Sequence, residues 1–148
     1  MSVEIVDTTS PELVSAMNDL IPQLSSSTPP LSPEQIESFV AQDYVYLFVY
    51  RPDTEDESGD RPILGMLSLA TFDIPTGRRA WIEDVVVDNA ARGQGAGQKL
   101  VEAAVRHAQA IGAKSVDLTS RPSREAANRL YRRAGFVLRE TNVYRFEG

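Results

Sequence analysis

The fold of this chain is decided by the segment Val85–Gly97, which reads VVVDNAARGQGAG. Three consecutive valines are typical of a buried strand, and the glycine-rich part that follows them opens a helix. The first N–H groups of a helix lack partners within it, and glycines have no Cβ to hold an anion away. We therefore predict an anion cradle where the strand passes into the helix, which carries roughly half a positive charge at its N-terminus.

Two other glycine-rich anion sites are excluded by spacing. The dinucleotide fingerprint requires a glycine where this chain has Gln98, and the nucleotide P-loop requires a Gly-Lys-Ser/Thr ending that is missing. The alternative without a ligand is a glycine-rich turn that only lets the helix pack closely on its strand.

The remaining pattern predicts strands and helices on both sides of this segment. Alternation of apolar residues predicts strands, three of which should form an antiparallel meander. Ser-Pro pairs mark the starts of helices, and glycines mark their ends. The expected strands are Val3–Asp7, Tyr44–Tyr50, Ile63–Phe72, Ala80–Val87, Ser115–Thr119 and one or two within Phe136–Phe146. The expected helices begin at Ser10 and Ser32, cover Leu100–Ile111 before Gly112, and cover Ser123–Ala134 before Gly135. Residues 1–148 thus read as one α/β domain with a mixed sheet and helices on its faces.

Composition excludes several classes of protein. The absence of Cys removes disulfides, thiolate metal sites and cysteine nucleophiles, and no metal site is predicted. The net charge of −6 weighs against nucleic acid binding, which depends on Lys and Arg. No apolar run approaches the roughly 20 residues of a membrane helix, and the start MSVEIVDTTS lacks a signal pattern. We expect a cytoplasmic protein without a membrane or nucleic acid partner.

Charge is unevenly distributed along the chain. Residues 1–87 hold 15 acidic and 4 basic side chains, a balance of −11, whereas residues 88–148 hold 6 acidic and 11 basic side chains, a balance of +5. An anionic ligand on the C-terminal half and a cationic ligand on the N-terminal half would suit this distribution, and so would ordinary surface variation.

Two motifs in this sequence resemble those of the GNAT acetyltransferase superfamily. The first, Gln/Arg-x-x-Gly-x-Gly/Ala preceded five residues earlier by Val, is present as Val87, Arg92, Gly95 and Gly97. The second, Ala-x-x-Leu-Tyr-x-x-x-Gly-Phe, is present from Ala127 to Phe136. The resemblance implies a mostly antiparallel mixed sheet of six to seven strands with a splayed parallel pair, flanked by about four helices. It also implies acetyl-CoA as co-substrate.

The resemblance assigns cofactor contacts to the first motif. The strand residues Val85, Val86 and Val87 would pair with the pantetheine arm, with the Val87 N–H near the thioester oxygen. The backbone amides of the cradle would bind the pyrophosphate of CoA; these belong to Arg92, Gly93, Gln94, Gly95, Ala96 and Gly97.

The second motif would supply a catalytic acid and further cofactor contacts. By resemblance, Tyr131 would protonate the leaving thiolate, the alternative being an amphipathic core tyrosine. Many family members have a pantetheine-binding Asn seven residues before this tyrosine, where this chain has Arg124, and Asn128 lies one helical turn later. Either side chain could make that contact. The arginines around them suit the 3′-phosphate of CoA or a solvated helix face.

A base is required to deprotonate an ammonium acceptor, and Glu83 and Asp84 are the candidates. Alternation places Glu83 on the face of Val85 and Val87 and Asp84 on the opposite face. The pair resembles one that precedes the same valine strand in diamine and polyamine acetyltransferases. The alternative is a salt bridge from one of them to Arg78 or Arg79.

The resulting hypothesis is an N-acetyltransferase that moves acetyl from acetyl-CoA to a primary amine of a small molecule by direct attack in a ternary complex. A polyamine, an amino acid or an aminoglycoside-like amine would suit the acidic half. A protein or peptide amine acetyltransferase and a non-catalytic acyl-CoA sensor are the alternatives. A homodimer is compatible with the family, and we interpret His107, the single histidine, as a surface or packing residue.

Overall fold

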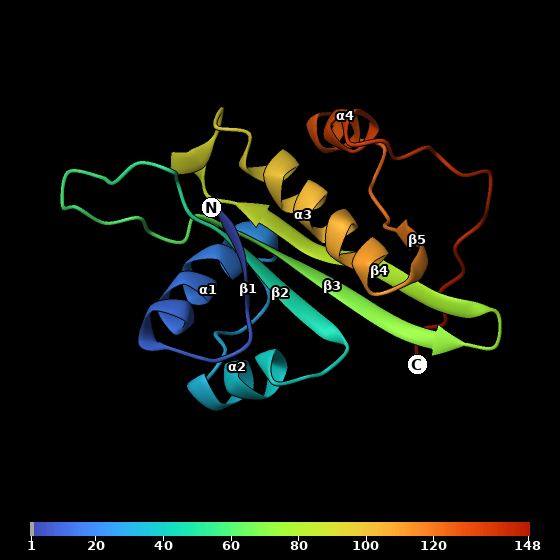
Figure 1. Cartoon of the computed structure of the whole chain (residues 1–148), viewed down its shortest axis with the longest axis horizontal. Helices are drawn as coiled ribbons and strands as arrows, with labels where there is room; N and C mark the ends of the chain where they lie inside the picture. The colour runs from blue at the N-terminus through green and yellow to red at the C-terminus, as the bar shows by residue number, and fades with distance from the viewer. Residues whose placement is uncertain (1) are drawn as a thin grey trace.

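The computed structural model describes residues 2–148, and within them five strands form one sheet in the order β1-β2-β3-β4-β5. β1 to β4 are antiparallel neighbours, and β5 joins the edge of β4 in parallel. Figure 1 shows this sheet at the centre of the molecule. The strands are β1 (Val3–Val6), β2 (Val45–Tyr50), β3 (Gly65–Ile74), β4 (Gly77–Val87) and β5 (Ala113–Asp117). The predicted meander is confirmed as β2-β3-β4.

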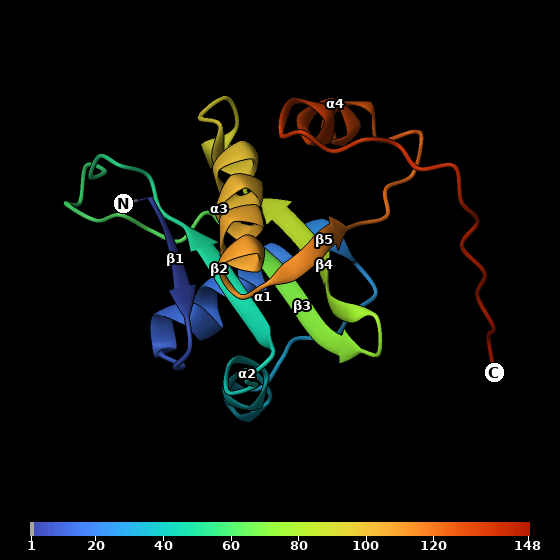
Figure 2. The same ribbon diagram turned by 45° about the vertical axis from the view of Figure 1, so that its right-hand side comes forward.

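Helices cover both faces of the sheet (Figure 2). One core lies between the sheet and α3 (Ala96–Ala110), and it includes the buried side chains of Leu67, Leu69 and Leu100. A second core lies on the other face under α1 (Pro11–Leu24) and α2 (Pro33–Val40). A single 3-10 turn, η1 (Asn89–Ala91), precedes α3, and α4 (Glu125–Arg133) lies beside α3.

The predicted helix starts are confirmed by their caps. The Ser10 hydroxyl accepts the Leu13 N–H at 3.1 Å, and Ser32 forms a capping box with Gln35. Gly112 follows α3 in the left-handed region with φ of 86°, and Gly135 does so after α4 with φ of 98°.

A β-bulge interrupts β4 next to the expected base. Met66 of β3 pairs with Val86 but Ser68 pairs with Glu83, so β4 holds one extra residue, and Asp84 has φ of 51°. Ile82 and Val85 therefore both face the α3 core, while Val86 faces the other core. The expectation that Glu83 shares the face of Val85 and Val87 is wrong, because the bulge shifts the alternation by one residue.

The parallel pair of strands is splayed, as the resemblance implied. Pairing of β4 with β5 ends at Trp81 and Asp117, so the β4 segment from Ile82 to Val87 has no partner on that side among the described residues. Its opposite edge is paired with β3 up to Val87. The free edge begins just before the bulge and leads to the cradle.

The α/β fold is confirmed, with five strands in the described residues in place of the expected six to seven. The difference lies in Phe136–Phe146, which we expected to form closing strands and which is extended without strand pairing. Residues from Val137 onward are exposed, because nothing in the described chain pairs with them. Among residues 2–148, no helix is both long and apolar enough to cross a membrane.

Candidate active site

A cleft of about 800 Å³ lies where β4, the cradle, α4 and the end of α1 meet. The free edge of β4 forms one wall, and the side chains of α4 form the opposite wall. This volume lies within the range of small-molecule and cofactor sites. The lining residues are Gln23, Leu24, Val85, Val86, Val87, Asn89, Ala91, Arg92, Gly93, Gly95, Ala96, Gly97, Gln98, Arg124, Ala126, Ala127, Leu130, Tyr131 and Arg133.

The cradle has the open backbone that an anion requires. Gly93 and Gly95 have φ of 82° and 72°, and a Cβ built on either would have no heavy atom within 4 Å. Such φ values strain residues other than glycine. The turn itself uses two amides, since Arg92 N–H donates to Asn89 O and Gln94 N–H to Ala91 O. The remaining N–H groups, those of Gly93, Gly95, Ala96 and Gly97, make no hydrogen bond to the described residues.

Side chains from distant segments hold the cradle in place. Gln23 of α1 donates to Asp88 Oδ2 at 2.9 Å, and Asp88 Oδ1 accepts the Ala90 N–H at 2.9 Å. These two hydrogen bonds, that from Ala90 above all, keep the pKa of the Asp88 carboxyl below its usual range. The Tyr50 hydroxyl donates to Gln94 Oε1 at 3.1 Å, which ties the cradle to β2. The loop is therefore held in shape before any ligand binds.

Tyr131 stands on the α4 wall of the cleft. Burial raises the pKa of its hydroxyl, while the nearby positive charge of Arg124 acts in the opposite direction. The ring packs near Phe136, with centroids 6.0 Å apart. Because its ordinary pKa near 10 is raised, the hydroxyl is protonated at neutral pH and can donate a proton or a hydrogen bond.

The structure separates the two pantetheine candidates, Arg124 just before α4 and Asn128 within it. Arg124 lines the cleft, whereas the Asn128 side chain donates to Arg121 O at 3.1 Å and does not line it. The Asn128 amide thus stabilises the start of its own helix.

Glu83 and Asp84 are exposed beside the free edge of β4, just outside the residues that line the cleft. The alternative salt bridges to Arg78 and Arg79 are absent among the described residues. Arg78 Nε instead lies 2.7 Å from Asp73 Oδ1, and Arg79 Nη2 donates to Thr76 Oγ1 at 3.3 Å. Both carboxylates are therefore available to a ligand that approaches the splay.

Four lining residues lie outside both sequence motifs and were not among the predicted site residues: Gln23, Leu24, Gln98 and Ala126. Gln23 and Leu24 reach the cleft from the end of α1, more than 60 residues before the cradle, and only the folded topology brings them there. Gln98 follows the last residue of the cradle directly, and Ala126 directly precedes the second motif.

His107 is a packing residue, as we expected. Its ring lies edge-on to Tyr46 with centroids 4.3 Å apart and to Phe48 at 5.9 Å. Its Nε2 is buried without a hydrogen-bond partner in the described part of the chain, and burial lowers the pKa of the imidazole.

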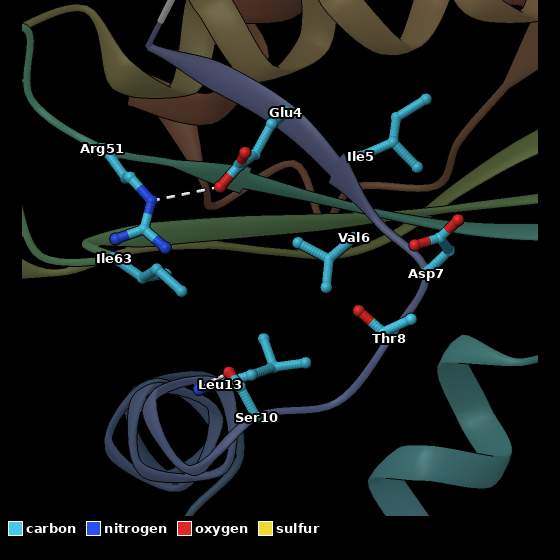
Figure 3. Close-up of a pocket in the computed structure, with 9 residues that line it drawn as sticks. All are labelled: Glu4, Ile5, Val6, Asp7, Thr8, Ser10, Leu13, Arg51 and Ile63. Carbon is cyan, nitrogen blue, oxygen red and sulfur yellow. Dashed lines mark hydrogen bonds and ion pairs between the residues drawn. The ribbon is translucent and has the colours of Figure 1, made fainter.

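A second, smaller hollow of about 230 Å³ lies between β1 and the start of α1 (Figure 3). Arg51 crosses it, with a two-point ion pair to Glu12 at 2.7 and 2.8 Å and a contact from Nε to Glu4 Oε1 at 3.1 Å. The hydrogen bond from Arg51 lowers the pKa of Glu12. Since these charges satisfy one another, we interpret the group as a link between β1, α1 and β2.

The fold and the cleft define an α/β domain with a glycine-rich cradle beside a splayed strand edge. Residues 13–136, which make up most of the chain, match the Acetyltransferase (GNAT) family. The protein belongs to that family. Among residues 2–148, no group of three or more His, Asp or Glu side chains is placed to hold a metal ion.

Individual relatives share parts of this protein to different extents. Glucosamine 6-phosphate N-acetyltransferase 1 of Oryza sativa subsp. japonica is 42% identical over 67 residues, which cover 45% of this chain and 38% of that protein. The match therefore spans little more than a third of that relative.

Two solved structures share the fold over nearly the whole chain. An aminoglycoside acetyltransferase from an uncultured soil metagenomic sample superposes with a TM-score of 0.81 at 18% identity, over 99% of this chain and 94% of that one. Glucosamine-6-phosphate N-acetyltransferase from Arabidopsis thaliana superposes with a TM-score of 0.76 at 21% identity, over 99% of each chain.

Proposed function

We propose that this protein transfers the acetyl group of acetyl-CoA to a primary amine of a small molecule by direct attack in a ternary complex. One observation carries the proposal: a cradle with free amides opens directly beside an unpaired strand edge, and a protonated tyrosine stands across the cleft. Family membership supports acetyl-CoA as the donor. A cytoplasmic location, where acetyl-CoA is available, stays a prediction.

The cleft offers each part of acetyl-CoA a matching group. The free N–H groups of Gly93, Gly95, Ala96 and Gly97 would donate to the pyrophosphate oxygens, and α3 would add the charge of its N-terminus. The β4 edge from Val85 to Val87 would pair with the amides of the pantetheine arm. Arg124, which lines the same cleft, would contact the arm or a phosphate.

The proposed reaction forms a C–N bond and breaks the C–S bond of the thioester that acetyl-CoA supplies. The Val87 N–H would stabilise the negative charge that develops on the carbonyl oxygen. Tyr131 would give its proton to the departing thiolate. Glu83 or Asp84, directly or through a water molecule, would accept the proton of the attacking amine, because an ammonium group has no lone pair with which to attack.

A small amine acceptor is supported by two observations. The exposed carboxylates of Glu83 and Asp84 lie beside the splay without an ionic partner in the described residues, and they would attract a cation. The names of two relatives given above specify an aminosugar phosphate and an aminoglycoside as acceptors. If no small amine is acetylated, two alternatives remain. The acceptor would be an amine of a protein or peptide, or the domain would sense acyl-CoA without turnover.

Release of free thiol from acetyl-CoA, measured across polyamines, amino acids, aminosugars and aminoglycosides, tests this proposal. The chain contains no Cys, so a thiol reagent reports only CoA. We expect turnover with at least one small amine, and a drop in kcat of about 10² for Tyr131→Phe with little change in KM for acetyl-CoA. Saturable CoA binding without turnover on any amine would instead identify a sensor.

A further inference from the structure

Trp81 of β4 and Asp117 of β5 are the last residues that the two parallel strands pair, so they lie at the closed end of the splay. The preceding pair, Ala80 and Val116, packs in the α3 core. Because side chains alternate along a strand, Trp81 and Asp117 both point to the opposite face of the sheet. An indole ring and a carboxylate therefore stand side by side where the free edge of β4 begins.

The part of the sheet face that carries Trp81 lies beyond the second core. Val86 is the only β4 residue in the core under α1 and α2, and Trp81 belongs to neither core. Opposite Trp81 on β3 is Ala70, whose small side chain covers little of an indole ring. Phe72, which shares this face by alternation, is 42% exposed. Trp81 is thus only half-buried and part of its side chain is open to a ligand.

The polar groups on this face have no partner among residues 2–148. The Trp81 indole N–H donates to none of them, and the Asp117 carboxylate, which is half-buried, makes no ion pair or hydrogen bond with them. Glu83 lies two residues after Trp81, before the bulge, and therefore shares its face. Its carboxylate is equally without a partner in this part of the chain.

We propose that Trp81 and Asp117 bind a second cationic group of the acceptor, so that the preferred acceptor is a small molecule with two amines. This inference rests on the proposed function, which puts the reacting amine beside Glu83. Residues two apart in a strand are separated by roughly 7 Å, a span of about four or five methylene groups. A diamine of that length would place one amine at Glu83 and the other at Trp81.

The two side chains would hold the second amine in different ways. The Asp117 carboxylate would supply an opposite charge, and the face of the Trp81 ring would attract the same cation through its quadrupole. The methylene groups between the amines would lie along the apolar part of the indole. Both contacts require a cation, so Trp81 and Asp117 would act as specificity-determining residues.

The same groups would discriminate against other amines. A monoamine would leave the Asp117 carboxylate to water and gain nothing from it. An amino acid with one amine would bring its own carboxylate beside that of Asp117, and the two negative charges would repel each other. The arrangement therefore narrows the range of acceptors to molecules with a second amine at the right distance.

The fluorescence of Trp81 tests the inference directly, because the chain has no other tryptophan. The full chain, saturated with CoA, is titrated with putrescine and with butylamine, which has the same carbon chain and a single amine. We expect a saturable change in emission with putrescine. Its affinity should be about tenfold higher than that of butylamine, the combined effect of an exposed ion pair and a cation–π contact.

Two substitutions separate the contributions, with calorimetry in place of fluorescence where Trp81 is changed. Asp117→Asn should lower the affinity for putrescine to that for butylamine and leave butylamine binding unchanged, which also shows that the variant is folded. Trp81→Phe keeps a smaller ring and should lose part of the preference. Glu57→Gln removes the same charge from the exposed loop between β2 and β3, on the side of the molecule away from β5 (Figure 1), and should bind putrescine like the parent.

The same amines, offered in the thiol-release assay, distinguish failure of the inference from failure of the proposed function. Equal affinities for putrescine and butylamine, or an Asp117→Asn variant that binds putrescine as tightly as the parent, would overturn the inference even if amines are acetylated. Putrescine binding that Asp117→Asn weakens, without acetyl transfer to any amine, would support the inference and contradict the proposed function.

Discussion

Gly97 approaches Leu130 so closely that a Cβ at position 97 would lie 2.8 Å from Leu130 Cδ1. The two residues belong to α3 and α4, and both line the cleft. Because Leu130 lies one residue before Tyr131, the glycine sets how near the proposed acid comes to the cradle. The family motifs around positions 97 and 130 are thus coupled through one packing contact.

Substituting Gly97→Ala should weaken CoA binding about tenfold without unfolding the protein. Alanine favours the helix over glycine by about 1 kcal/mol, which offsets part of the steric cost. Leu130 would have to move, and α4 would move with it. Calorimetric titration with CoA measures the affinity, and urea unfolding measures the stability.

A double variant shows whether Leu130 transmits the effect. In a Leu130→Ala background the added Cβ meets no obstacle, so Gly97→Ala should change CoA affinity by less than about twofold. Equal tenfold losses in both backgrounds would mean that the new methyl group obstructs CoA itself.

Gly95→Ala should weaken CoA binding more strongly, by an order of magnitude or more. Gly95 has φ of 72°, so alanine costs about 1 kcal/mol of backbone strain, and its methyl group would stand in the open space of the cradle. Gly59, in the loop between β2 and β3, is a matched control, with φ of 81° and equally open surroundings. Gly59→Ala should lose similar stability and keep its CoA affinity. A similar CoA affinity for both variants would contradict the cradle.

Most of the fold could be predicted from the sequence, because its signals are local. The Ser-Pro starts, the glycine ends and the alternating strands each depend on neighbours within a few residues, and the caps at Ser10 and Ser32 formed as expected. In most cases the predicted strand and helix boundaries differ from the observed ones by one or two residues. The glycine cradle was also local, since one continuous segment supplies all of its amides.

What could not be predicted depends on the sheet register or on distant segments. The bulge at Asp84 moves Glu83 to the other face, and its extra residue is visible only against β3. Gln23 and Leu24 reach the cleft through the packing of α1. The prediction of closing strands in Phe136–Phe146 was wrong, because strand propensity alone does not show whether a sheet edge will pair with that segment.

The bulge predicts different tolerances at Asp84. With φ of 51°, this position accepts Asn readily but strains a β-branched residue. We expect the free energy of unfolding of Asp84→Asn to lie within about 0.5 kcal/mol of the parent value. That of Asp84→Val should fall by about 2 kcal/mol. Denaturant unfolding measures both. If Asp84→Val is as stable as Asp84→Asn, the bulge is not formed in solution.

The Asp84→Asn variant, together with Glu83→Gln, also tests which residue is the base. Since Asp84→Asn keeps the bulge and Glu83→Gln keeps the length of the side chain, loss of turnover in either reports the carboxylate rather than the fold. We expect the variant that removes the base to lower kcat by about 10² or more and to recover partly as the pH rises and the amine deprotonates itself. Two fully active variants would exclude both residues as the base.

His107 should make the protein less stable as the pH falls below the ordinary histidine pKa. Burial lowers the pKa of this imidazole in the folded state, so between the folded and unfolded pKa values the unfolded chain binds more protons. The stability contributed by neutral His107 is thus complete above about pH 6.5 and is lost as the pH falls through that window. His107→Phe keeps a ring against Tyr46 and cannot be protonated. Urea unfolding at pH 7.5 and pH 5.5 should show a smaller drop for this variant, and an equal drop would assign the pH dependence to other groups.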